Sequence, residues 1–140
     1  MSHSLPDIRH SVCLYVPVAQ VWDAVATSEG IAGWFMPNSF EPTIGANFLL
    51  HSGQFGDSPC TVTKLVPKKV VEFRWDDDWT LRFELLGVGE HNTEFTLVHS
   101  GWDAEKRTRF GQPHTVIRGI MDGGWEKKVK QDLPNYVESR

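Results

Sequence analysis

Period-two alternation of apolar and polar residues over residues 70–100 constrains the fold of this chain most strongly. Segments 70–76, 79–87 and 92–100 carry apolar residues at odd-numbered positions and mostly polar residues at even-numbered positions. The apolar odd positions are Val71, Phe73, Trp75, Trp79, Leu81, Phe83, Leu85, Phe95 and Leu97. This spacing is typical of β-strands that are buried on one face. It predicts neighbouring antiparallel strands with one apolar face and one solvated face.

Helices are predicted on both sides of this region. Pro17 opens a segment whose apolar residues follow an amphipathic helical spacing. Residues 27–30 end that helix and can cap a short second one. After Pro113, apolar residues keep roughly helical spacing to the end of the chain, which predicts a long C-terminal helix. Further strands are predicted at residues 8–15, 46–51 and 59–66.

The order of these elements is that of an α+β domain. At 140 residues, the chain (residues 1–140) is expected to form one domain. We expect a curved antiparallel sheet of about six strands, with the helices against its apolar face. The space between the sheet and the last helix is either filled by aromatic side chains or left as a ligand cavity. Six Trp and eight Phe exceed the needs of an ordinary core of this size, which favours the cavity.

Three glycines lie in the first half of the predicted C-terminal helix: Gly119, Gly123 and Gly124. Each is expected to cost about 1 kcal/mol of helix stability relative to alanine. Such a cost suggests that something approaches the helix backbone closely at these positions. A bound molecule and a closely packed neighbouring strand are two explanations that both stay open.

Composition excludes several classes of protein. The chain has 14 Lys and Arg against 18 Asp and Glu, a net charge of −4, which argues against a nucleic-acid or anionic-membrane partner. No segment approaches the length of an apolar membrane span, and the first ten residues lack the apolar centre of a signal peptide. The cytoplasm is therefore the expected location. The two cysteines form neither a disulfide framework nor a metal motif.

His99 is the best candidate for chemistry. It shares strand parity with Phe95 and Leu97 and should therefore point toward the apolar face of the sheet. A neutral imidazole there can hydrogen-bond a ligand carbonyl or phenol, or act as a general acid or base. His10 also falls on the apolar side of its strand, whereas His51 is expected at the surface.

Other reactive side chains have simpler interpretations. Cys60 is expected to be buried and inert, and residues 76–78, three aspartates, are read as a solvated hairpin turn rather than a metal cluster. Arg118 and Asp122 are four residues apart and could pair on the helix, or Arg118 could reach a ligand carboxylate. No nucleophile, metal or nucleotide motif is present, so neither a metal nor a cofactor is expected.

Four motifs resemble one known superfamily. They are VPVAQVWDAVAT, SEGIAGWFMP, FTLVHSGW and IRGIMDGGW, at residues 16–27, 28–37, 95–102 and 117–125. Together they resemble the SRPBCC (START/Bet v-like) superfamily, and within it the branch named after the activator of the ninety-kilodalton heat-shock chaperone ATPase. The likeness covers residues 7–138. It implies a helix-grip fold, in which a curved sheet wraps around a long C-terminal helix and leaves an elongated cavity between them.

The resemblance also implies a function. Members of the superfamily carry, sense or sequester hydrophobic small molecules, some relatives are polyketide cyclases or aromatases, and the namesake is a co-chaperone. By motif, the mouth of the cavity is expected at Trp34, Phe35 and Met36, one end at His99 and Trp102, and the helix wall at Met121, Gly124 and Trp125.

Our leading hypothesis is a cytoplasmic protein, more plausibly a binding protein than an enzyme, that encloses an aromatic or lipid-like molecule. The predicted ligand-binding residues are Trp34, Phe35, Met36, Phe48, Trp75, Leu81, Phe83, Phe95, Leu97, His99, Met121 and Trp125. The first alternative is a cyclase-like, aromatase-like or hydrolase-like enzyme that uses His99. The second is a module that regulates a chaperone, which would require an exposed apolar patch outside the cavity.

Overall fold

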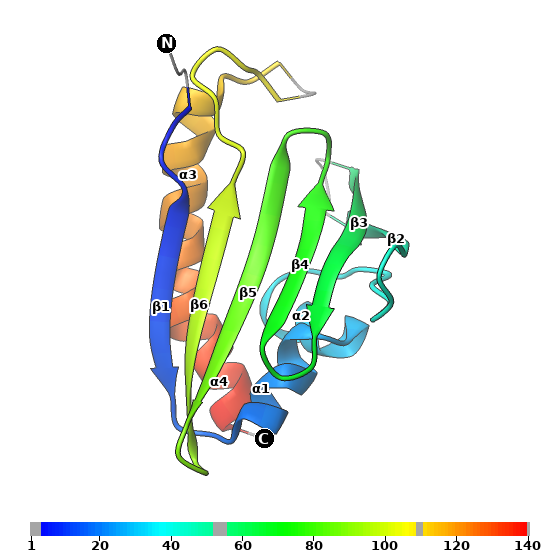
Figure 1. Cartoon of the computed structure of the whole chain (residues 1–140). Coiled ribbons are helices and arrows are strands. Elements are labelled where there is room, and N and C mark those ends of the chain that lie inside the picture. Colours follow the sequence, from blue (N-terminus) through cyan, green and yellow to red (C-terminus); the bar gives the residue numbers. More distant parts are fainter. Residues whose placement is uncertain (1–3, 52–55, 109–110, 140) are drawn as a thin grey trace.

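The computed structural model of the chain describes residues 4–51, 56–108 and 111–139. Six strands form one antiparallel sheet with the order β1-β6-β5-β4-β3-β2 (Figure 1). The strands are β1 (Ile8–Leu14), β2 (Asn47–His51), β3 (Asp57–Val66), β4 (Val70–Trp75), β5 (Trp79–Val88) and β6 (Asn92–Ser100). The helices are α1 (Val18–Val25), α2 (Ser28–Trp34), α3 (His114–Lys127), the π-helical turn η2 (Lys128–Asp132) and α4 (Leu133–Glu138).

The predicted alternation sets which face of the sheet is buried. Along β5 the odd-numbered residues from Trp79 to Leu85 are buried, and the even-numbered residues between them are more exposed. In the register between strands, Phe83 lies opposite Val71 on one side and Leu97 on the other, so apolar residues meet across three strands. The sheet therefore has one continuous apolar face, as the sequence predicts.

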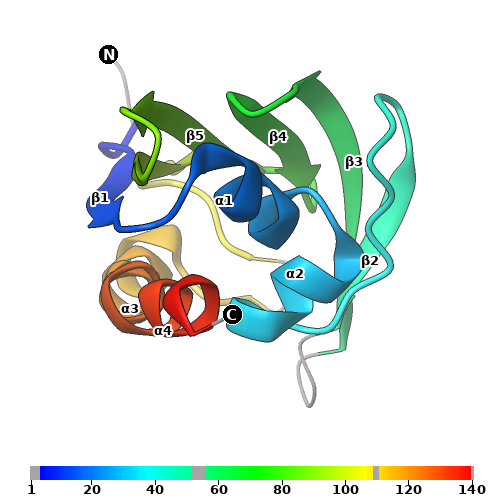
Figure 2. The ribbon, with the colours of Figure 1, turned by 90° about the horizontal axis from the view of Figure 1, so that it is seen from below.

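All helices lie on that face. Figure 2 shows the sheet curving around α1, α2 and the C-terminal helix, with α3 beneath β1 and α2 on the side of β2. This arrangement is the helix-grip fold, with the two short helices and the long C-terminal helix in the predicted order. Among the described residues, no helix combines the length and the apolar character needed to cross a membrane.

Local contacts fix α2 in its place beside the C-terminal helix. The Thr27 hydroxyl caps α2 by accepting a hydrogen bond from the Gly30 amide at 3.0 Å. Gly33 on the next turn has no side chain, and a Cβ atom at this position would overlap the ring of Tyr136 from α4. Because only glycine leaves this space, α2 and α4 can pack ring against backbone.

The C-terminal helix is one continuous run with a wide turn in its middle. It begins directly after Pro113, as predicted, and its turn at η2 is followed by Pro134. Proline lacks the amide hydrogen for a regular helical bond, and this loss accounts for an irregular turn just before it. Such π-helical turns occur often at functional sites.

Close packing against a strand does not explain the three helix glycines. A Cβ atom placed on Gly119, Gly123 or Gly124 would meet nothing within 4 Å. The interpretation that close helix–strand packing requires these glycines is therefore wrong. Val116 and Ile120 on the same helix are 56% and 66% exposed, so this part of α3 faces outward.

Candidate functional site

Four of the six tryptophans gather with two histidines at one end of the sheet. We call this group the tryptophan–histidine cluster; it consists of Trp75, Trp79, His99, Trp102, His114 and Trp125. Trp75 stacks on the His99 ring at 5.4 Å between centroids, and Trp79 meets the same ring edge to face at 5.1 Å. The cluster accounts for much of the unusual tryptophan content of the chain.

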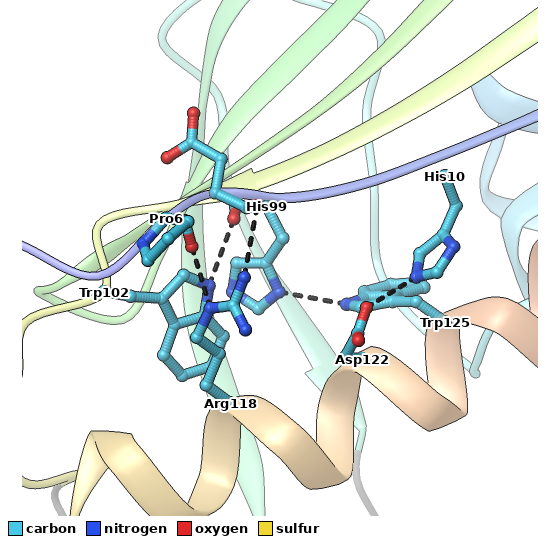
Figure 3. A network of polar contacts seen from close by, with 8 residues as sticks. Pro6, His10, His99, Trp102, Arg118, Asp122 and Trp125 are labelled. Carbon is cyan, nitrogen blue, oxygen red and sulfur yellow. Dashed lines mark hydrogen bonds and ion pairs between the residues drawn. The ribbon is translucent and has the colours of Figure 1, made fainter.

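His99 lies at the centre of this cluster and is fully buried. Its Nδ1 accepts a hydrogen bond from Trp125 Nε1 at 3.0 Å, and its backbone carbonyl accepts one from Trp102 Nε1 at 3.1 Å (Figure 3). Burial, together with the nearby His114 and Arg118, lowers the pKa of His99 to about 3. His99 is therefore neutral near pH 7. Because an indole N–H can only donate, the His99 proton lies on Nε2.

Four N–H groups in the cluster have no hydrogen-bond partner among the described residues. They are Trp75 Nε1, Trp79 Nε1, His99 Nε2 and His114 Nε2, the last of which lies 3.7 Å from an Asp78 carboxylate oxygen. Buried donors without acceptors are uncommon in folded proteins. This end of the fold therefore has unused capacity to donate hydrogen bonds to an oxygen acceptor.

A chain of aromatic rings fills the space between the middle of the sheet and the helices. Trp34 meets Phe83 at 5.4 Å and Phe95 at 5.9 Å between ring centroids, and Phe73 joins Phe83 to Phe48. Trp34 Nε1 also donates to the Ala24 carbonyl at 2.8 Å, which anchors the ring in the interior. These rings form part of the hydrophobic core in this conformation.

Beside the tryptophan–histidine cluster, an apolar pocket of about 220 Å³ opens between the end of α2, β4 and α3. It is lined by Phe35, Met36, Trp75, Ile120, Met121, Gly124, Trp125 and Lys128. Phe35 packs against Trp125 at 4.8 Å and against Trp75 at 5.9 Å between ring centroids, so aromatic rings form its inner wall. We refer to it below as the apolar pocket.

The structure brings some predicted ligand-binding residues together and separates others. Phe35, Met36, Trp75, Met121 and Trp125 all line the apolar pocket, and so does Gly124 of the predicted helix wall. The remaining predicted residues are buried in the core or the cluster away from this pocket: Trp34, Phe48, Leu81, Phe83, Phe95, Leu97 and His99. Sequence reasoning missed Ile120 and Lys128. Ile120 stands beside Met121 in a predicted motif, and Lys128 follows Gly124 and Trp125 by four and three residues on the same helix face.

Charged residues on α3 bind other parts of the protein rather than each other. Arg118 donates to the Pro6 and Asp7 carbonyls at 2.8 and 3.3 Å, and Asp122 pairs with His10 at 2.7 Å (Figure 3). The helix pair suggested by their spacing is therefore wrong. Both residues instead hold α3 against β1 and the segment before it.

The other candidate side chains have structural roles. His51 pairs with Asp57 at 2.8 Å at the partly exposed outer edge of the sheet. Burial and the nearby charge of Asp76 raise the pKa of the Cys60 thiol, which makes it a poor nucleophile. Among the residues that the structure describes, no three His, Cys, Asp or Glu side chains are grouped to bind a metal ion.

Comparison with known families then identifies the chain. The family model described as activator of Hsp90 ATPase homolog 1-like protein matches residues 15–138. The chain belongs to this family. No curated protein matches it.

Solved structures agree with this family and fold. A Bacillus halodurans protein with a solution structure is 38% identical, covers 98% of this chain and 99% of its own, and has a TM-score of 0.86. The Aha1 dimer from Colwellia psychrerythraea is 19% identical, with 94% and 96% coverage and a TM-score of 0.73. DynU16, from the dynemicin biosynthetic locus, is 23% identical over 95% of this chain and 47% of its own, with a TM-score of 0.74. The last two show that the fold is shared.

Proposed function

We propose that the protein is a cytoplasmic binding protein that holds a small aromatic molecule in the apolar pocket, as its carrier, sensor or sequesterer. The observation that carries this proposal is the convergence of five predicted residues from three separate segments on one open, apolar pocket. These residues are Phe35, Met36, Trp75, Met121 and Trp125. DynU16, a protein of the same fold, belongs to a biosynthetic locus, which is consistent with small-molecule chemistry.

The size and lining of the apolar pocket set the class of ligand. An apolar cavity of about 150 Å³ is large enough to bind benzene, and the pocket here measures about 220 Å³. It therefore suits a body of one or two aromatic rings. Tryptophan and phenylalanine faces favour edge-to-face ring contacts, and the Met36 and Met121 thioethers adapt to irregular shapes.

Binding of such a ligand is expected to be modest in strength. Burying about 200 Å² of apolar ligand surface at about 25 cal/mol per Å² gives roughly 5 kcal/mol. This corresponds to a dissociation constant on the order of 0.2 mM. The deeper predicted residues, such as Phe83 and Phe95, are proposed to contact a larger or lipid-like ligand after their rings move apart.

The enzyme alternative receives less support from the geometry. A general acid or base works best when its pKa lies near the working pH, and the pKa of His99 is about 3. His99 is also enclosed by tryptophan rings and does not line the apolar pocket. These observations favour a role for His99 in positioning Trp125 over a role in proton transfer.

The chaperone-regulating alternative requires a continuous apolar surface outside the pocket. Among the described residues, the large exposed apolar side chains are Tyr15, Ile44, Leu49, Leu86, Val88, Val116 and Ile120. Leu86 and Val88 are two residues apart on β5, and Val116 and Ile120 are one turn apart on α3, while the others are separate; exposed apolar residues in such small groups are ordinary. Small-molecule binding is therefore the function that the geometry supports best.

Naphthalene provides a direct test of this proposal. Titration into ¹⁵N-labelled protein should shift the indole N–H signals of Trp125 and Trp75. Gly124→Leu places a side chain in the pocket and should abolish these shifts. Gly123→Leu is the matched control, because Gly123 is adjacent but does not line the pocket, and it should leave binding intact. Equal binding by both variants, or no binding by the wild type up to the solubility limit, would refute the proposal.

A further inference from the structure

We propose that Lys128 makes the apolar pocket selective for aromatic molecules that carry an anionic group such as a carboxylate. This inference rests on the proposed function and names the class of ligand more narrowly. The pocket is lined by apolar side chains and by one cation, Lys128. A ligand with an apolar body and a single negative end would match this arrangement.

The Lys128 side chain is held at the rim of the pocket by contacts with Phe35. Its Nζ donates to the Phe35 carbonyl at 3.1 Å and lies 5.8 Å from the centroid of the Phe35 ring. Phe35 itself packs on Trp125, which forms the inner wall. The ammonium group is therefore fixed close to the position that the edge of a bound aromatic ring would occupy.

Lys128 also has unused capacity to bind an anion. An ammonium group has three donor hydrogens, and the Phe35 carbonyl takes one of them. Within the part of the chain that the structure describes, no carboxylate oxygen lies within 4 Å of Lys128 Nζ. Asp132, one turn further along, instead pairs with the neighbouring Lys127 at 3.9 Å. Among the described residues, Lys128 consequently has no ion-pair partner.

The surroundings of Lys128 show where the anionic group would lie. On the other side of Lys128, a groove of about 470 Å³ runs between α2 and the C-terminal helix and contains Asp132, Asn135 and Tyr136. Lys128 and Phe35 line both this polar groove and the apolar pocket. A carboxylate bound to Nζ would thus face the polar groove and keep contact with water, which avoids the cost of complete desolvation.

The π-helical turn is an independent observation that marks the same residue. Lys128 is the first residue of η2, directly after α3 ends at Lys127. Such turns occur often at functional sites, and the Lys128 amide itself still bonds to the Gly124 and Trp125 carbonyls of α3. Here the turn begins at the cation that lines the pocket.

β-Naphthoate and β-naphthamide test this inference, because they share shape and size and differ in charge. We expect Lys128→Met to weaken β-naphthoate binding about five- to tenfold and to leave β-naphthamide binding within about twofold. Lys128→Arg should retain most of the affinity for β-naphthoate. Lys127→Met is the control for general charge, since Lys127 does not line the pocket, and it should have little effect on either ligand. Raising the salt concentration should weaken only β-naphthoate binding.

The possible outcomes separate this inference from the proposed function. If β-naphthamide or naphthalene binds in the pocket and Lys128→Met leaves β-naphthoate affinity unchanged, the anion selectivity is refuted and the binding function stands. If β-naphthoate does not bind while β-naphthamide does, the inference is also refuted. If no naphthalene derivative binds, or if binding is unaffected by Gly124→Leu, the proposed function itself fails.

Discussion

The imidazole of His99 and the indole of Trp125 are joined by a buried hydrogen bond of 3.0 Å that links β6 to α3. The same Trp125 ring forms the inner wall of the apolar pocket and packs against Phe35. One bond in the core therefore fixes the position of a residue that would contact the ligand. This relationship makes His99 a positioning residue in our interpretation.

Trp125→Phe should destabilise the fold by about 1–3 kcal/mol, because it leaves His99 Nδ1 buried without a donor. Urea unfolding followed by circular dichroism measures the change. A double-mutant cycle with His99→Leu isolates the pair, and we expect a coupling energy of at least about 0.5 kcal/mol. Strictly additive effects of the two substitutions would show that the bond contributes nothing.

Stability should fall as the pH is lowered from about 6.5 toward 3. The pKa of His99 in the folded protein is about 3, below the ordinary histidine value of 6.5, so the unfolded chain binds the extra proton first. The contribution of His99 is fully present above pH 6.5 and is lost at up to about 1.4 kcal/mol per pH unit below it.

His99→Gln provides the comparison for this pH dependence, since glutamine can accept the Trp125 hydrogen bond but does not titrate. Between pH 7 and pH 4 the wild type should lose more stability than the variant. The dependence of stability on pH that remains in the variant includes a contribution from His114. Burial also lowers the pKa of His114, and nearby Asp78 opposes that shift. Parallel pH profiles for the two proteins would contradict the assignment.

Two glycine substitutions should act in opposite directions. Gly33→Ala should destabilise the fold, because its Cβ would collide with the Tyr136 ring. Gly119→Ala should stabilise it by about 0.5–1 kcal/mol, because its Cβ would extend into open space on a regular helix. Thermal unfolding of both variants beside the wild type measures this difference. A destabilising Gly119→Ala would indicate a contact on the outer face of α3 in solution.

The two cysteines should differ sharply in reactivity. Cys13 is exposed, whereas Cys60 is buried and its pKa is raised by that burial. Iodoacetamide at pH 8 should therefore add one label to the folded protein and two to the unfolded protein, as counted by mass spectrometry. Cys13→Ser should remain unlabelled while folded. Rapid labelling of Cys60 in the folded variant would disprove its burial.

The sequence predicted the sheet well because burial on one face dictates period-two spacing, as along β4 and β5. The C-terminal helix began after Pro113 as expected, since the fixed φ of proline suits the start of a helix. Partners of charged side chains were harder to predict. Arg118 and Asp122 have suitable helical spacing for a pair, but the tertiary fold offers them the Pro6 carbonyl and His10 instead.

The candidate site was predicted only in part, for a physical reason. Strand alternation shows that Phe83 and Phe95 are buried, but not whether their rings touch neighbouring rings or surround a space. That outcome depends on ring orientations across several strands, and here the rings are in contact. Lys128 was missed because an apolar pattern does not mark a lysine, although it follows Trp125 and Gly124 by three and four residues at regular helical spacing.

The pairing of β1 with β6 has a consequence for synthesis of the chain. Ile8 lies opposite His99, so the first strand can complete the sheet only after about a hundred residues have been made. The helix that covers the adjoining apolar face comes later still, at the C-terminal end of the chain. A nascent or truncated chain without that helix would expose Trp75, Trp79 and their neighbours to water. Nascent chains of this protein should therefore be prone to aggregation until the C-terminal helix has been made.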